Sequence, residues 1–174
     1  MPRGATVWLT GRGFACYRLD GDVLRATISS DLGVDPASRD ENVRRAGHLA
    51  MLLADAGLLV VASIISPYAD GRKAARELHE ASGIDFLEIY LDTPLAVCER
   101  RDRRGLYARA RRGELTLVTG IDDPYEPPGN PELVVHPSQD EPPAVAERVL
   151  EAVLAHDLSG VLRLDAQASA AQRR

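Results

Sequence analysis

Residues 58–65, LLVVASII, form the stretch of sequence that decides the fold class of this chain. A continuous run rich in β-branched side chains is typical of a strand covered on both faces, as strands in parallel sheets are. Shorter apolar runs of the same kind lie at 7–10, 15–19, 86–91 and 133–135. We therefore predict an α/β fold with a mostly parallel sheet and helices on both faces.

The segments between these strands have helical character. From 39 to 55 the apolar residues recur at helical spacing, and Gly57 is suited to end that helix. Further helices are predicted at 73–82, 94–101 and 144–155. Strands that alternate with helices in this way favour a parallel sheet over an antiparallel sandwich.

The length of 174 residues suits one compact domain, which we place at 1–160, followed by a C-terminal tail at 161–174. Within the domain, the segment 102–131 is rich in Arg, Gly and Pro and has little apolar periodicity. We expect this segment to form a mobile excursion from the core, placed like a lid.

Composition excludes several classes of function. The formal net charge of −5 makes nucleic acid and anionic membranes poor partners. Cys16 and Cys98 are isolated and the four histidines are scattered, so we expect neither a disulfide framework nor a zinc site. No apolar run is long enough to span a bilayer or to act as a signal peptide, and we expect a cytoplasmic protein.

Two carboxylates follow the strand at 15–19. Asp20 and Asp22 flank Gly21 at the end of a strand, which is where ligands bind in a parallel sheet. Such a pair can hold magnesium or accept a proton from a hydroxyl group. The alternative is a plain turn, because Asp-Gly-Asp is also good turn chemistry.

Four blocks of sequence stand out along the chain. They are LDGDVLR at 19–25, DLG at 31–33 with RDENVRR at 39–45, ISPY at 65–68, and CERRD at 98–102 leading through GLY at 105–107 to TGIDDPYE at 119–126. Together the blocks resemble the adenylylsulfate kinase family, which phosphorylates the 3′-hydroxyl of adenylylsulfate with ATP and magnesium. They occur in the family's order and spacing over residues 4–155, and the resemblance implies the fold of P-loop kinases.

The resemblance also implies roles for single residues. Asp22 would act at the acceptor hydroxyl, and Asp20 and Asp22 together would hold Mg2+. Asp20, Arg101 and Arg104 would contact ATP, and Ser66 matches a serine proposed to carry a phosphorylated intermediate. The positions that would bind the acceptor are Arg25, Arg39, Asn42, Ile65, Thr119 and Gly120.

Simpler interpretations of the same residues stay open. Arg39 could solvate one helix face together with Arg44 and Arg45, as charge clusters usually do. The hydroxyl of Ser66 could cap a strand end before Pro67. The seven arginines between 100 and 112 would, without the resemblance, indicate a solvated loop.

The chain departs from the family's pattern near its N-terminus. The family carries Gly-x-x-x-x-Gly-Lys-Ser/Thr after its first strand, but the only lysine here, Lys73, is followed by Ala74. About twenty residues, the phosphate-binding loop and its helix, are missing between Gly11 and Arg12. ATP binding is therefore predicted to be impaired, because backbone N–H groups, lysine and hydroxyl are lost together.

The short link also constrains the first strand. The four residues 11–14 span at most about 14 Å, whereas a parallel crossover needs about a dozen residues. We expect the strand at 7–10 to be displaced or reversed, in preference to its exchange with a second chain in a homodimer.

The acceptor site is altered as well. Two phenylalanines that sandwich adenine in the family correspond to Val34 and Val118, a lysine to Thr116 and an arginine to Ala69. Loss of both stacking faces would weaken binding by a few kcal/mol, at about 1–3 kcal/mol per stacked base.

Three hypotheses follow for a partner that is a small nucleotide or another anionic ligand. We favour an adenylylsulfate kinase-like protein that has lost ATP-dependent catalysis, either as an impaired enzyme or as a non-catalytic partner of sulfate-activating enzymes. The second is a working kinase of the sulfate pathway whose missing loop is replaced by another chain or by an unusual arrangement. The third is a fold retained for a different small phosphorylated or sulfated ligand.

Overall fold

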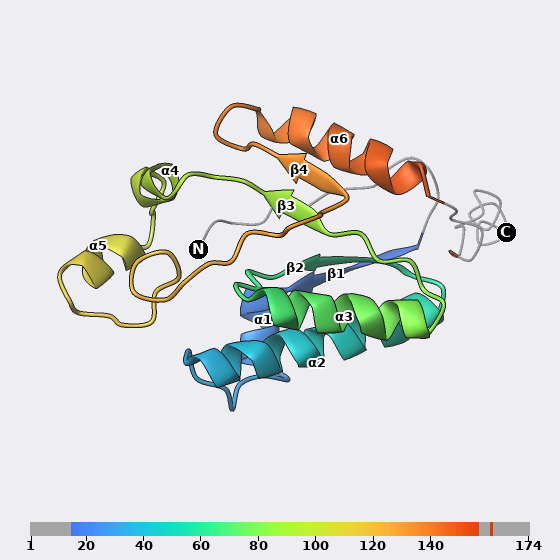
Figure 1. Ribbon diagram of the computed structural model, residues 1–174, viewed down its shortest axis with the longest axis horizontal. Helices are drawn as coiled ribbons and strands as arrows, with labels where there is room; N and C mark the ends of the chain where they lie inside the picture. Colours follow the sequence, from blue (N-terminus) through green and yellow to red (C-terminus); the bar gives the residue numbers. More distant parts are fainter. Residues whose placement is uncertain (1–14, 157–160, 162–174) are drawn as a thin grey trace, which may run out of the picture.

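The computed structural model describes residues 15–156 and 161, in which four strands occur as two parallel pairs (Figure 1). β1 (Cys16–Asp20) pairs with β2 (Leu59–Ser63), and β3 (Ile89–Leu91) pairs with β4 (Leu133–Val135). The helices are α1 (Gly21–Ala26), α2 (Pro36–Asp55), α3 (Ala69–Ala81), α4 (Leu95–Arg100), α5 (Leu106–Arg111) and α6 (Pro142–Leu154).

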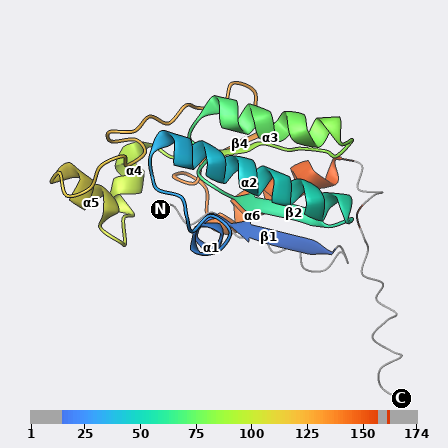
Figure 2. The same cartoon turned by 90° about the horizontal axis from the view of Figure 1, so that it is seen from below.

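Helices cover the strands from two sides. α2 lies against the β1–β2 pair with α3 beside it, whereas α6 lies on the other side, against β4 (Figures 1 and 2). The predicted α/β fold with parallel strands and helices on both faces is confirmed. Within the described residues the strands form two separate pairs rather than one continuous sheet.

The main core lies between α2 and the β1–β2 pair. Four buried residues form its centre, namely Leu19, Leu24, Ala46 and Ala50. Small residues on α2 let α3 come close: a Cβ added at Gly47 would lie 3.4 Å from the Cβ of Ala75. α2 begins with Asp35 as N-cap, whose carboxylate accepts from the Ser38 amide, and with Pro36 in its first turn.

The segment 102–131 has more structure than its composition indicated. It projects from the strands, as expected of an excursion (Figure 1), but it contains α5 and a second apolar cluster. Tyr107, Ala110 and Val118 are the buried members of that cluster. The prediction missed this small core because six helical residues are too few to display a hydrophobic period.

The strand expected at 7–10 lies outside the described residues. Its reversal or displacement therefore stays a prediction. The same holds for the tail predicted at 161–174, of which only residue 161 is described.

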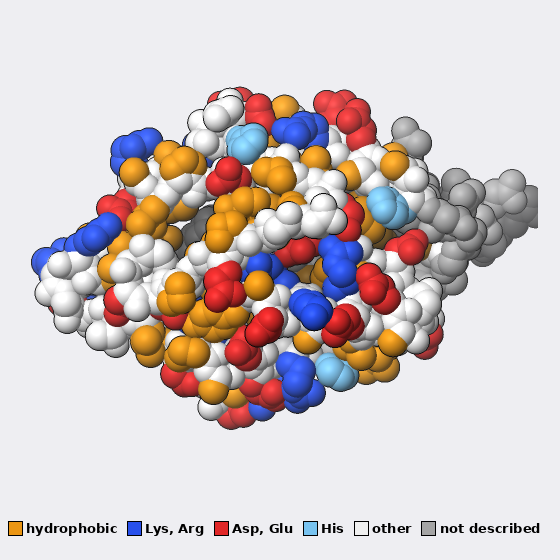
Figure 3. All heavy atoms as spheres, viewed as in Figure 1, with side chains coloured by type: hydrophobic (Ala, Val, Ile, Leu, Met, Phe, Trp, Pro, Cys, Tyr) orange, Lys and Arg blue, Asp and Glu red, His pale blue; other side chains and the backbone are white. Residues whose placement is uncertain are grey.

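An ion-pair network joins α3 to the segments that precede β3 and β4. Arg72 Nε lies 2.8 Å from Glu88 Oε1, as an ion pair rather than a well-aligned hydrogen bond. Arg76 makes a two-pronged contact with Glu132, at 2.8 and 2.7 Å. Figure 3 shows basic and acidic side chains interleaved between α3 and the β3–β4 pair, where this network lies. The network therefore couples α3, which packs against α2, to the β3–β4 pair.

Arg72 is the most buried cation of this network, with 11% of its side chain exposed. Its guanidinium also donates to the carbonyl groups of Ser66, at 2.7 Å, and Glu126, at 2.6 Å. These contacts connect the loop after β2 with the end of the 119–126 block. Arg72 therefore holds together segments that are distant in sequence.

We expect Arg72→Met to lower the free energy of unfolding by about 2 kcal/mol, because Glu88 would keep only Arg76, 3.7 Å away, as a cation. Urea unfolding measures this. Lys73→Met is the matched control: Lys73 is 71% exposed and, among the described residues, pairs with Glu77 alone, so its loss should change stability by less than about 0.5 kcal/mol. Equal effects of the two substitutions would show that the network does not stabilise the fold.

Candidate functional site

The Asp-Gly-Asp sequence forms a strand-end turn that starts α1. Asp20 Oδ1 accepts hydrogen bonds from the amides of Asp22, at 2.9 Å, and Val23, at 3.3 Å. Gly21 passes so close to β2 that an added Cβ would lie 3.2 Å from the Ser63 carbonyl oxygen. The contacts of Asp20 are therefore those of a turn residue, as the alternative interpretation expected. A ligand role for Asp20 stays a prediction.

Asp22 projects from the same turn with a different partner. Its carboxylate is about half exposed, and Oδ2 lies 3.5 Å from Arg104 Nη2 in the projecting segment. The structure thus brings together two residues for which separate roles at the nucleotide were predicted.

These contacts bear on the magnesium site. Asp20 Oδ1 is used in capping, and Oδ2 lies 3.9 Å from Arg18. No group of three or more His, Cys, Asp or Glu residues among those described could hold a metal ion. The described residues therefore do not form a metal site of their own. No backbone amide among them donates a hydrogen bond to the Asp22 carboxylate, so its oxygens could still bind a metal ion.

Arg25 and Arg39 lie close to each other where α1 faces the start of α2. Arg25 Nη1 donates to the Gly33 carbonyl at 2.6 Å. Burial lowers the pKa of Arg25, and the nearby charge of Arg39 lowers it further. The charge of Asp35 opposes part of this effect, and the two neighbouring cations favour an anion here.

Arg39 is largely engaged by backbone oxygens. Its Nε donates to the Val34 carbonyl at 2.8 Å, and its Nη2 donates to the Leu117 carbonyl at 2.5 Å. Nε also lies 3.5 Å from Asp123 Oδ2, with 12% of the Arg39 side chain exposed. The interpretation of Arg39 as a solvated residue of one helix face is therefore wrong.

Asn42 lies one helical turn after Arg39, on the same face of α2. It is 5% exposed, and its Oδ1 has no hydrogen-bond partner among the described residues. A buried carbonyl oxygen without a donor is costly, so a ligand that supplies an N–H or O–H group there would be favoured.

The 117–123 turn, which belongs to the projecting segment, borders this region on one side. Asp122 accepts hydrogen bonds from the amides of Leu117 and Val118, both at 2.7 Å, which hold the pKa of Asp122 below its ordinary value. Leu117 has φ 58°, an unfavourable conformation for a residue with a side chain. Gly120, at φ 88°, adopts a similar conformation without that cost.

The loop after β2 carries a second strained residue. Ser66 has φ 37°, and its carbonyl is held by Arg72. The preceding residue, Ile65, is 46% exposed. Both non-glycine residues with positive φ thus lie in loops around the site, and an arginine binds the carbonyl of each.

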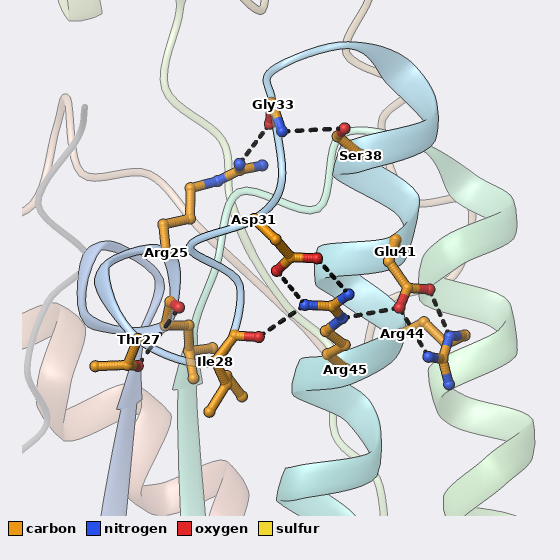
Figure 4. A network of polar contacts seen from close by, with 10 residues as sticks. Arg25, Thr27, Ile28, Asp31, Gly33, Ser38, Glu41, Arg44 and Arg45 are labelled. Atoms are coloured by element: carbon orange, nitrogen blue, oxygen red, sulfur yellow. Dashed lines mark hydrogen bonds and ion pairs between the residues drawn. The ribbon is translucent and has the colours of Figure 1, made fainter.

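A polar network fixes the 25–33 loop to α2 (Figure 4). Arg45 binds Asp31 at 2.6 and 2.9 Å and donates to the Ile28 carbonyl at 2.7 Å. Glu41 joins Arg44 and Arg45, and hydrogen bonds from both hold the pKa of Glu41 at about 2. Arg45 thus holds the loop against α2, and Arg44 is an ion-pair partner of Glu41. Neither arginine serves as a ligand of the site.

Comparisons with known proteins decide the family. A model of the adenylylsulphate kinase family matches residues 3–136. The chain belongs to the adenylylsulphate kinase family.

Relatives within this family are substantially similar. The chain is 48% identical to the bifunctional enzyme CysN/CysC of Mycobacterium tuberculosis over 79% of its own length, but it spans only 26% of that protein. It is 38% identical to the adenylyl-sulfate kinase of Clostridium acetobutylicum, over 90% of this chain and 86% of that one. The solved structure of the M. tuberculosis APS kinase CysC in complex with AMPPNP and APS matches with a TM-score of 0.79 and 49% identity, covering 82% of each chain.

The match to CysN/CysC also bears on the predicted gap. It extends over 157 residues, whereas 79% of this chain's 174 residues is about 137. About 20 positions of the relative therefore have no counterpart here. This number agrees with the predicted gap of about twenty residues, although the match does not locate the unmatched positions.

The two arginines expected at the nucleotide have different partners. Arg104, in the projecting segment, reaches Asp22, whereas Arg101, at the end of α4, donates to the Pro137 carbonyl at 3.0 Å. Arg109 and Arg112 pair with Glu114 inside the segment, and Arg111 pairs with Glu99 of α4.

No helix among the described residues is long and apolar enough to cross a membrane.

Sequence reasoning missed the most buried carboxylate of the site. Asp123 contacts Tyr68, Thr119 and Arg39, yet neither Asp123 nor Tyr68 was selected as a site residue. Both lie inside blocks that carry the resemblance, at 65–68 and 119–126. The available signal was a pair of adjacent aspartates in a turn, of which only one can face inward.

We expect Glu41 to titrate at about pH 2 in the native protein, as NMR of its side-chain carboxyl would measure. Because this folded-state pKa lies below the unfolded value, the contribution of Glu41 to stability is complete above about pH 4.5 and is lost as the pH falls toward 2. Glu41→Gln should remove that part of the acid dependence. An ordinary pKa for Glu41 in the native protein would contradict the network in Figure 4.

Proposed function

We propose that the described site binds the acceptor of the adenylylsulfate kinase reaction, adenylylsulfate, and that phosphorylation with ATP is impaired in this chain. The observation that carries the proposal is the placement of Arg25 near Arg39, whose charge lowers the Arg25 pKa, together with Asn42, one helical turn after Arg39, whose carbonyl has no donor among the described residues. A sulfate or phosphate group would relieve the repulsion between the cations, and an adenine amino group could donate to Asn42.

The relatives support this choice of ligand. The M. tuberculosis CysC structure, 49% identical, holds APS together with AMPPNP. Arg25, Arg39 and Asn42 lie within the range that the family model matches. Because this chain spans 26% of the bifunctional relative, any further activity of that protein is not carried over.

The donor side of the reaction lacks a comparable set of residues. The only lysine, Lys73, lies on α3, where it is 71% exposed and pairs with Glu77 at 3.6 Å. It cannot serve as the lysine of a phosphate-binding loop, which must follow the first strand and begin a helix. The count of about 20 unmatched positions in CysN/CysC supports the loss of that loop.

Asp22 is the residue we assign to the acceptor hydroxyl. Its exposed carboxylate could accept a proton there, once Arg104 moves from its position 3.5 Å away. Mg2+ and ATP, the family's cofactors, would have to bind with Asp22 as the main carboxylate, since Asp20 caps α1. A magnesium ion held by one protein carboxylate takes its other ligands from the nucleotide phosphates and from water.

One observation favours a different acceptor. Val34 is 53% exposed, whereas Val118 is buried in the α5 cluster. Neither offers an aromatic face to a base. A smaller phosphorylated or sulfated ligand, without a stacked base, is the second candidate.

Calorimetry separates these alternatives. We expect adenylylsulfate to bind the full chain, and ATP with Mg2+ to bind weakly or not at all. Arg25→Ala should weaken adenylylsulfate binding by about 10- to 100-fold, the loss of one hydrogen bond to a charged group. Arg44→Ala is the matched control, since Arg44 pairs only with Glu41 on the exposed side of α2, and it should leave the affinity unchanged.

Three outcomes would count against the proposal. Absence of adenylylsulfate binding would refute the acceptor assignment, and equal binding of adenosine-free sulfate esters would favour the second candidate. Micromolar affinity for ATP with Mg2+ would refute the impairment. If phosphorylation is observed, Asp22→Asn should abolish it.

A further inference from the structure

Asp123 is a buried anion at a junction of three segments. Its side chain is 2% exposed. Oδ1 accepts a hydrogen bond from the Tyr68 hydroxyl at 2.6 Å, and Oδ2 accepts one from Thr119 Oγ1 at 3.2 Å. Oδ2 also lies 3.5 Å from Arg39 Nε. The three partners belong to the loop after β2, the 117–123 turn and α2.

The neighbouring aspartate has a separate task. Asp122 binds the amides of Leu117 and Val118, which closes the turn locally. Asp123 contributes to the turn through its backbone, whose carbonyl accepts from the Gly120 amide at 2.7 Å. Besides the contact with Thr119 inside the turn, its carboxylate is directed to Tyr68 and Arg39, which lie outside it.

The orientation of Arg39 depends on these contacts. A guanidinium is a rigid planar fork, so fixing two of its nitrogens fixes the direction of the third. The carbonyl groups of Val34 and Leu117 bind Nε and Nη2, and the buried carboxylate of Asp123 lies 3.5 Å from Nε. The described residues provide Nη1 with no hydrogen-bond partner, so this nitrogen remains for an external anion.

We propose that Asp123 is a positioning residue of the acceptor site: its carboxylate orients Arg39 and anchors the 117–123 turn to α2, so that Arg39 Nη1 is presented to the anionic group of the ligand. This inference rests on the proposed function. Asp123 itself does not touch the ligand. It acts through Arg39, as the charge that compensates a buried cation.

The Tyr68 hydroxyl provides a spectroscopic report on this carboxylate. Burial raises the pKa of Tyr68 to about 12, and the hydrogen bond to Asp123 contributes to the shift. Removing the negative charge of Asp123 should therefore lower the pKa of Tyr68 but leave it above 10, because burial remains. A change that only loosens the fold elsewhere would not affect this hydroxyl.

The test compares Asp123→Asn with Val145→Ala, a cavity in the buried face of α6 that destabilises the fold away from the site. Asparagine keeps the shape of the side chain and can still accept from Tyr68. We expect Asp123→Asn to weaken adenylylsulfate binding at least tenfold in calorimetry and to lower the Tyr68 pKa in an absorbance titration. Val145→Ala should change neither, although both variants lose stability in urea.

A second arm needs no ligand. The exchange of the Arg39 Nε proton with water, followed by NMR, should accelerate in Asp123→Asn and stay unchanged in Val145→Ala. If wild-type protein fails to bind adenylylsulfate, the proposed function fails and the positioning role falls with it. If wild type binds but Asp123→Asn binds equally well, or if the Arg39 proton exchanges at the wild-type rate, the positioning role alone is overturned.

Discussion

The parallel pairing of β1 with β2 is the constraint on which the site depends. Because both strands run in the same direction, with Asp20 opposite Ser63, the loops that follow them emerge at one edge. The chain can return to start β2 only through a crossover, which here is α2. The start of that helix carries Arg39 and Asn42 to the same edge. Residues from four separate segments therefore meet without any of them being adjacent in sequence.

Arginine side chains then hold the loops at this edge. Four loop carbonyls each accept a hydrogen bond from a guanidinium, and these pairs are Arg25 with Gly33, Arg39 with Leu117, Arg45 with Ile28 and Arg72 with Ser66. Loops have few backbone partners of their own, so their carbonyl groups need donors from elsewhere. A guanidinium offers several donors in fixed directions, whereas an ammonium group does not. This use of arginine is consistent with a chain that contains a single lysine.

Much of the framework could be predicted because it depends on local periodicity. The strand at 133–135 was placed correctly, and the helix expected at 39–55 begins only three residues earlier, at Pro36. The contacts within the site were harder to predict from the sequence. Asp20 and Arg39 were selected, but their contacts could not be predicted: capping competes with ligand binding at Asp20, and the partner of Arg39, Leu117, lies 78 residues away. Backbone conformations such as φ 58° at Leu117 depend on such distant contacts and leave no local pattern.

The two sides of the family's reaction differ in how the fold supports them. On the acceptor side, the structure maintains features that oppose stability, namely a pair of neighbouring cations and a buried Asn42 oxygen without a donor. Replacement of Asn42 by an apolar residue of similar size would remove the desolvation cost, so the fold itself does not require this group. An anionic ligand with a donor group offsets both penalties at once. On the donor side the described residues show no comparable energetic penalty, because the lysine that would need a phosphate partner is absent from the sequence. This difference between the two sides is our reason for proposing acceptor binding in preference to ATP binding.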